Sequence, residues 1–236
     1  MSHFTVAVFT DSTTSVDELL APYEEGTNDS MFLEWVPASE SMEEITAKFN
    51  EKKDGSENLK QFVKRWYGYD YNPAYRNFGY ICNPNAKWDW YEVGGRWNNR
   101  LRIKGNPDAS CNEAQVCDID FSIDEDAYNK ALRFWEVVVE GSPIYGYERE
   151  EDFRSFFNAK YYLEQYGTKE NYAKSAASFS VWAFITPDGE WHENGAMGWF
   201  GFNDATQESR RSFAEELEKA IQENPYCTMT VVDCHI

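Results

Sequence analysis

Basic residues are scarce in this chain of 236 residues, which has 22 lysines and arginines against 41 aspartates and glutamates and a formal net charge of −19. This shortage argues against a broad basic surface, so we expect no direct binding to nucleic acid. Long apolar runs are also missing, and none approaches the roughly 18 residues of a transmembrane helix, so we expect no membrane partner. The start, MSHFTVAVFT, has neither a basic region nor a long apolar stretch, and we interpret it as a strand and not as a signal peptide.

Cysteines are few, and motifs of known chemistry are missing. Five scattered cysteines do not make a disulfide framework in a chain this long, and the spacing of Cys111 and Cys117 is not that of a zinc-binding pair. We therefore expect free thiols and a cytoplasmic location. The sequence shows no Ser-His-Asp motif, phosphate loop, dinucleotide fingerprint or EF-hand loop, so it identifies no catalytic residue.

Apolar and aromatic residues are plentiful, at 42% and 17%, and predict a folded core. Strand patterns at 3–10 and 227–235, a hairpin at 179–193 and amphipathic helices such as 206–223 predict an α+β protein. We expect a mixed, largely antiparallel sheet with adjacent N- and C-terminal strands and helices packed on it. We expect residues 1–236 to form a single domain with a helical insertion at roughly 105–178.

The three histidines, His3, His192 and His235, all lie at or near strand ends. If the terminal strands are antiparallel neighbours, His3 meets His235; if they are parallel, the two residues lie about 25 Å apart at roughly 3.3 Å per residue. The antiparallel arrangement makes a three-histidine site for one divalent transition metal possible, with Asp233 or Cys234 in support. The alternative is that each histidine is an ordinary strand-end residue and that no cofactor is bound.

Two segments are rich in aromatic residues and glycine, NPNAKWDWYEVGGRW at 83–97 and WHENGAMGWFGF at 191–202. Their tryptophans could stack on a planar ligand, and an arginine could reach an anionic group on it. The alternative is that the aromatic residues form core and cross-strand contacts of a hairpin. The candidate ligand-binding residues are Trp88, Asp89, Trp90, Arg96, Trp97 and Trp199.

Residues 11–51 contain eleven acidic residues and one lysine. Such a segment is either an ordinary solvated face or a surface that binds a basic protein. The candidate residues of this acidic partner-binding face are Asp17, Glu18, Glu24, Glu25, Glu43 and Glu44.

Five blocks of the chain resemble an uncharacterised family of proteins from bacteriophages, plasmids and their bacterial hosts. They are MSHFTV, LLAPYEE at 19–25, NPNAKWDWYEVGGRW, PDGEWHENGAMGWFG at 187–201 and the final VVDCHI, in this order. The resemblance implies an accessory protein of mobile elements in the cytoplasm of the bacterial host, and it implies no activity.

Two functions follow as hypotheses. The first is a non-enzymatic acidic protein that binds and inhibits a host defence or nucleic-acid-acting protein with a basic surface, as an anti-CRISPR protein or a nucleic-acid mimic does. The second is a metal-dependent enzyme or a binder of a nucleotide-like small ligand, with a site built from the three histidines and walled by aromatic residues. The second hypothesis requires these residues to converge on one cavity.

Overall fold

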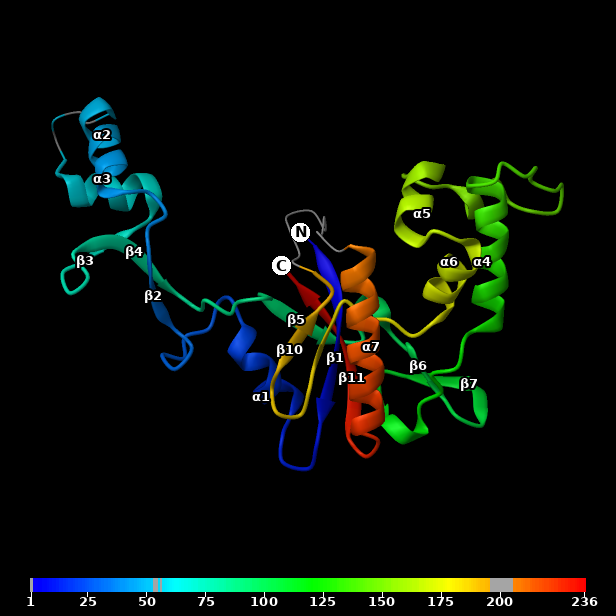
Figure 1. The fold of residues 1–236 in the computed structure, drawn as a ribbon. Helices are drawn as coiled ribbons and strands as arrows, with labels where there is room; N and C mark the ends of the chain where they lie inside the picture. Colours follow the sequence, from blue (N-terminus) through cyan, green and yellow to red (C-terminus); the bar gives the residue numbers. More distant parts are fainter. Residues whose placement is uncertain (1, 53–54, 56, 196–205) are drawn as a thin grey trace. The chain divides into compact units, whose positions relative to one another are not determined.

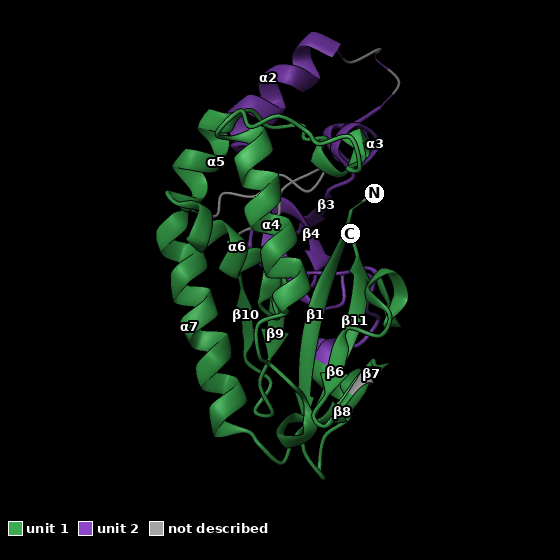
Figure 2. Cartoon of the chain, turned by 90° about the vertical axis from the view of Figure 1, so that its right-hand side faces the viewer, with its two compact units in different colours: residues 1–19, 90–236 green, residues 20–89 purple. Residues whose placement is uncertain are grey.

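The computed structural model describes residues 2–52, 55, 57–195 and 206–236. The chain divides into two compact units, of which the larger contains residues 1–19 and 90–236 and the smaller residues 20–89 (Figure 2). The sequence predicts one domain with a helical insertion at roughly 105–178. The structure groups residues 105–178 with the larger unit, and it is the segment 20–89 that forms a unit of its own.

A six-stranded sheet forms the centre of the larger unit (Figure 1). Its strands are β1 (His3–Thr10), β5 (Trp90–Val93), β8 (Glu113–Gln115), β9 (Ala183–Ile185), β10 (Trp191–Glu193) and β11 (Thr228–His235). Their order is β10-β9-β1-β11-β5, with β8 also paired to β11, and every pair except β1–β9 is antiparallel. The predicted α+β class, the largely antiparallel sheet and the adjacent terminal strands are confirmed.

The two terminal strands are the central strands of this sheet. In each of them every residue after the first is buried, because both faces of the strand are covered. Burial on both faces explains why β1 has a continuous run of apolar residues, Val6 to Phe9, and not an alternation of apolar and polar ones. On one face α7 (Gln207–Glu223) packs Phe213 and Leu217 into a core with Phe184 and Val231. The predicted helix at 206–223 is thus confirmed as the cover of this face.

The rest of the larger unit consists of short helices and one further hairpin. The α-helices are α1 (Val16–Leu20), α4 (Glu125–Val138), α5 (Ala159–Tyr166) and α6 (Lys169–Ala177), and the hairpin is β6 (Leu101–Ile103) with β7 (Asn106–Cys111). Three 3-10 helices are η2 (Gly95–Trp97), η3 (Val116–Asp118) and η4 (Glu150–Phe153). Aromatic rings join α4, α5 and α6: the Tyr162 ring lies 5.5 Å from Phe134 and 5.6 Å from Tyr172. No described helix has both the length and the apolar character needed to cross a membrane.

The smaller unit is a three-stranded antiparallel sheet with two α-helices. Its elements are η1 (Ala21–Tyr23), β2 (Glu34–Pro37), α2 (Met42–Lys52), α3 (Leu59–Tyr67), β3 (Asp70–Asn72) and β4 (Asn77–Cys82), with strand order β2-β4-β3. Ile45 of α2, Phe62 and Val63 of α3 and Phe78 of β4 form its core. The apolar stripe on α3 follows from the spacing of its residues, because positions i, i+3 and i+4 share one helix face.

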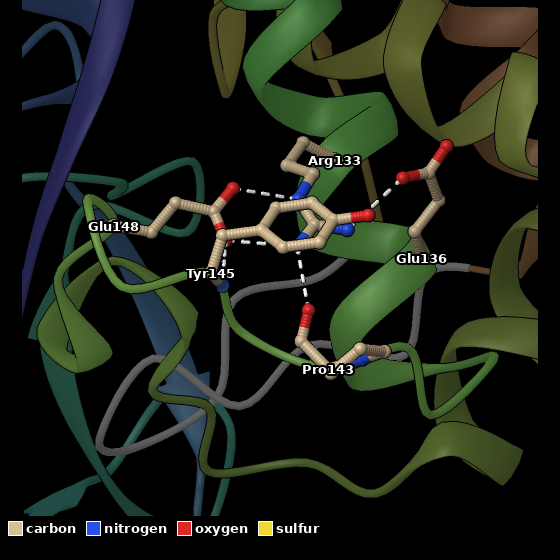
Figure 3. A network of polar contacts seen from close by, with 5 residues as sticks. All are labelled: Arg133, Glu136, Pro143, Tyr145 and Glu148. Atoms are coloured by element: carbon tan, nitrogen blue, oxygen red, sulfur yellow. Dashed lines mark hydrogen bonds and ion pairs between the residues drawn. The ribbon is translucent and has the colours of Figure 1, made fainter.

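A network around Arg133 joins α4 to the loop that follows it (Figure 3). Arg133 donates to both carboxylate oxygens of Glu148, at 2.7 and 2.8 Å, and to the carbonyl oxygen of Pro143 at 2.8 Å. It also pairs with Glu136, and its guanidinium lies 4.5 Å from the centre of the Tyr145 ring. The hydrogen bonds from Arg133, with a further one from the Tyr145 amide, lower the pKa of Glu148 to about 2. The loop after α4 is therefore held by charge-assisted bonds.

Glu148→Gln is expected to lower the free energy of unfolding at neutral pH, because glutamine cannot accept a charge-assisted pair from Arg133. The pKa of Glu148 falls from its ordinary value of 4.5 to about 2 in the folded chain. The stability that this carboxylate contributes is therefore fully present above about pH 4.5 and is lost as the pH falls through about 2. Urea unfolding across this pH range measures the difference between the two proteins, which should shrink towards low pH. Glu150→Gln, at an exposed position of η4, is the control, and an equal difference at neutral pH and at about pH 2 would contradict the prediction.

Candidate functional site

Three neighbouring strands of the larger unit bring three rings, those of His3, His235 and Trp90, into one cluster in which each ring contacts the other two. In the antiparallel register His3 of β1 lies opposite His235 of β11, and His235 lies opposite Trp90 of β5. Residues opposite one another on neighbouring strands point to the same face. The Trp90 ring stacks on His235 at 5.1 Å with an angle of 16° between the planes, and His3 meets His235 edge-on at 4.9 Å. The prediction that His3 meets His235 is confirmed.

Asp233 lies two residues before His235 and therefore on the same face of β11. Its side chain is almost fully buried, and Nδ1 of His3 lies 2.8 Å from its Oδ1. The backbone N–H of Arg96 donates to Oδ2 at 3.0 Å. Because a carboxylate only accepts hydrogen bonds, His3 donates from Nδ1. In the tautomer that carries its proton on Nδ1, Nε2 has a lone pair for another partner.

Glycine at position 95 permits this arrangement. Gly95 adopts a φ of +49°, in the left-handed region, and begins η2 directly after β5 and Gly94. A Cβ atom at this position would lie 2.4 Å from Cβ of Asp233 and 2.6 Å from its Oδ2. Only a residue without a side chain lets the backbone of η2 approach the carboxylate so closely.

A surface pocket of about 430 Å³ opens beside the His3–Asp233 pair. Its lining comes from β1, β5, β11 and the segment around η2, and consists of His3, Trp90, Glu92, Val93, Gly95, Arg96, Asn98 and Asp233. The Trp90 ring is 44% exposed and Arg96 is exposed, whereas Asp233 and His235 are buried. The pocket thus presents an aromatic face, a guanidinium and an imidazole oriented by a carboxylate.

The chemistry open to this site is proton exchange and anion binding. An imidazole oriented by a buried carboxylate is a general base, because the carboxylate stabilises the imidazolium that forms. Cys234 does not take part: it points to the opposite face of β11, and burial raises the pKa of its thiol far above the ordinary range. All five cysteines, each within the described residues, are free thiols, as predicted.

His192 lies away from the other two histidines. It belongs to β10, where the register aligns it with Phe184 of β9 and, through Phe184, with Ala7 of β1. It is therefore two strands and four residues from His3, on the order of 16 Å. Its ring stacks on Phe184 at 4.5 Å, and its Nδ1 lies 3.2 Å from a carboxylate oxygen of Glu216 on α7.

The predicted three-histidine cluster therefore reduces to a pair, His3 and His235. Over the part of the chain that the structure describes, no three His, Cys, Asp or Glu side chains are grouped so that they could hold a metal ion.

The other predicted ligand-binding residues have different surroundings. Trp97 is half-buried and packs against the core beneath α7. Trp88 and Asp89 belong to the smaller unit, where Trp88 is buried and its Nε1 donates to the Leu20 carbonyl at 3.3 Å. Trp199 lies outside the described residues.

The predicted acidic face is divided between the two units. Asp17 and Glu18 lie on α1 of the larger unit, whereas the other four residues belong to the smaller one. Glu24 is half-buried. The other five are exposed: Asp17, Glu18, Glu25, Glu43 and Glu44.

Several of these acidic side chains also have local structural partners. The Glu44 carboxylate accepts from the backbone N–H of Ser41 at the start of α2, and that of Glu18 accepts from Ser15 in the same way. The Tyr91 hydroxyl donates to Asp17. The pKa of Tyr91 is raised, mainly by burial and in second place by this hydrogen bond. Part of the acidic segment therefore serves to begin helices.

Gly95, Glu92 and Asn98 were not among the candidate residues chosen from the sequence, and Asp233 was named only in support of a metal site. The signal for Asp233 was its spacing of two from His235, which places both side chains on one face of a strand. The others depend on the pairing of β5 with β11, which the sequence does not specify. No family model, no curated protein and no solved structure matches this chain.

Proposed function

We propose that the larger unit binds a small ligand with a planar ring and an anionic group, as in a nucleotide, in the pocket beside His3. The observation that carries this proposal is the convergence of His3, Trp90, Arg96 and Asp233 on one pocket from separate chain segments. A volume of about 430 Å³ lies within the usual range of small-molecule sites.

Each part of the ligand has a complementary group. The Trp90 ring stacks on His235 and meets His3 edge-on at 5.4 Å, and Trp90 is still 44% exposed, so its exposed part offers a flat surface for a ligand ring. Arg96, exposed at the pocket, suits a carboxylate or phosphate group. His3, oriented by Asp233, can accept a hydrogen bond or a proton from a ligand hydroxyl. If the ligand is transformed, His3 is the base.

Trp90→Ala and Arg96→Ala are each expected to weaken binding of a nucleoside monophosphate at least tenfold, in titration calorimetry with a panel of the common ribonucleotides. One stacked base contributes about 1–3 kcal/mol, and a tenfold change corresponds to about 1.4 kcal/mol. Trp66→Ala is the matched control, because Trp66 is 45% exposed and stacks on one ring, that of Phe62.

Arg211→Ala, on the exposed side of α7, is the control for the loss of a positive charge. The proposal fails if the wild-type protein binds none of the nucleotides, or if Trp66→Ala weakens binding as much as Trp90→Ala does.

A second proposal rests on the net charge of −19 and on the exposed carboxylates of α1 and α2. We infer that the chain also binds a protein with a basic surface, such as a host defence protein or one that acts on nucleic acid. Electrostatic complementarity of this kind accelerates association and weakens as salt rises. Binding of a labelled basic peptide by the wild-type chain, measured at several salt concentrations, tests this proposal.

A further inference from the structure

Exposed apolar side chains gather between residues 144 and 157 of the larger unit, in and after the loop that follows α4. Five of the seventeen large hydrophobic side chains that are exposed among the described residues fall within these fourteen residues. Scattered exposed hydrophobic residues are ordinary, whereas exposed apolar side chains that lie together mark an interaction site. The five are Ile144, Tyr145, Tyr147, Phe156 and Phe157, and they define the 144–157 surface.

The first part of this surface is held firmly. The Arg133 network binds the loop at Pro143, Tyr145 and Glu148 (Figure 3), and the Arg133 guanidinium covers one face of the Tyr145 ring. Tyr147 stacks on Tyr145 at 5.7 Å and is 85% exposed. Charge-assisted hydrogen bonds therefore hold this loop in a conformation in which Tyr147 is exposed to solvent.

The second part is held by Ser155. Its hydroxyl lies 2.7 Å from that of Tyr162 and accepts from the Phe157 amide at 2.9 Å. The Phe157 ring stacks on Tyr161 at 3.9 Å, while Phe156 is fully exposed. Both parts thus present an aromatic ring from a backbone that is already fixed, which lowers the entropy that binding would cost.

Carboxylates lie between the two aromatic parts in the sequence, and Arg133, which is 4.5 Å from the centre of the Tyr145 ring and 5.8 Å from that of Phe153 in η4, brings η4 close to the first part. The helix η4 contains Glu150, Glu151 and Asp152 in succession, all exposed, and Arg149 pairs with Asp152 at 2.9 Å. Residues 148–154 hold four carboxylates against two arginines, Arg149 and Arg154, and are therefore net acidic. A net acidic surface with aromatic anchors attracts lysine and arginine through both charge and cation–π contacts. A second copy of this chain would bring another net charge of −19, and an anionic membrane would be repelled in the same way.

We propose that the 144–157 surface docks a basic polypeptide segment, whose apolar side chains cover Tyr147 and Phe156 and whose cationic groups face η4. The inference rests on the second proposed function, and it gives that function a surface distinct from both the pocket and the segment 11–51. Aromatic anchors at the centre of an interface usually carry most of its affinity.

The test uses the full chain and a fluorescein-labelled amphipathic peptide of leucine and lysine, with fluorescence anisotropy as the readout. The double variant Tyr147→Ser, Phe156→Ser is expected to bind the peptide at least tenfold more weakly than the wild type. Tyr226→Ser is the matched control, because Tyr226 is 83% exposed and lies outside this surface. Glu150→Gln with Glu151→Gln should weaken binding and reduce its dependence on salt.

The outcomes separate the two proposals. If the wild-type protein does not bind the basic peptide at all, the proposed binding of a basic partner fails. If the wild type binds and the double variant binds equally well, or Tyr226→Ser loses as much, the 144–157 surface is not the docking site. A wild-type dimer in sedimentation that the double variant abolishes would assign the surface to a second copy and overturn the inference.

Discussion

Gly95→Ala is expected to lower the free energy of unfolding of the larger unit by about 3 kcal/mol and to separate Asp233 from His3. The alanine Cβ would lie 2.4 Å from Cβ of Asp233, far inside van der Waals contact, at a φ of +49° that alanine rarely adopts. Asp233 is buried in a central strand and has little room to retreat. Either η2 moves away and the Arg96 N–H leaves the carboxylate, or the carboxylate moves and His3 loses its partner.

Urea unfolding measures the stability of this variant, and the imidazole NMR signals of His3 report its hydrogen bond. Gly105→Ala is the matched control, because Gly105 has a φ of +73° but nothing within 4 Å of a Cβ added there. Gly105→Ala should lower the free energy of unfolding only through the unfavourable left-handed backbone conformation, by about 1 kcal/mol. Equal losses in the two variants would mean that the close approach of η2 to Asp233 contributes nothing to stability.

Phe184→Ala is expected to cost about 3 to 5 kcal/mol, because it removes a large ring from the centre of the core and leaves a cavity. Phe184 is 1% exposed on β9, and its ring contacts those of Phe9 and Phe213, at 6.2 and 5.5 Å, and stacks on His192. A single core joins β1, β9, β11 and α7, so the loss acts on the whole larger unit.

Phe156→Ala is the control for this second substitution, because the same atoms are removed from a side chain that is fully exposed. Its effect on unfolding should stay within about 0.5 kcal/mol. The prediction for Phe184 would be wrong if both variants unfolded at the same urea concentration with the same dependence on urea.

The sequence was sufficient for the parts of the fold that depend on local periodicity. Apolar patterns identified the terminal strands, the 179–193 hairpin and α7, and antiparallel pairing of the ends was enough to bring His3 to His235. The sequence does not specify the register of β9 and β10 against β1. It therefore could not show that His192 is aligned, through Phe184, with Ala7 and not with His3.

Other features depend on long-range contacts. The separation of residues 20–89 as a unit follows from the core of Ile45, Phe62 and Phe78, whose members share no local pattern. Trp88 is buried, and its Nε1 donates to the carbonyl oxygen of Leu20, 68 residues earlier in the chain. In a segment that alternates aromatic and polar residues, only the packed structure decides which tryptophan is core and which is exposed.

The contact between His3 and Asp233 joins residues that are 230 positions apart. Contacts of such sequence separation form slowly, because the loop-closure entropy must be overcome before pairing gives any stabilisation. During synthesis β1 is made first, yet its antiparallel neighbour leaves the ribosome only after everything between them. The β1–β11 pair and the pocket beside it must therefore assemble after β11 has been translated. A nascent chain that lacks β11 has neither this strand pair nor the pocket.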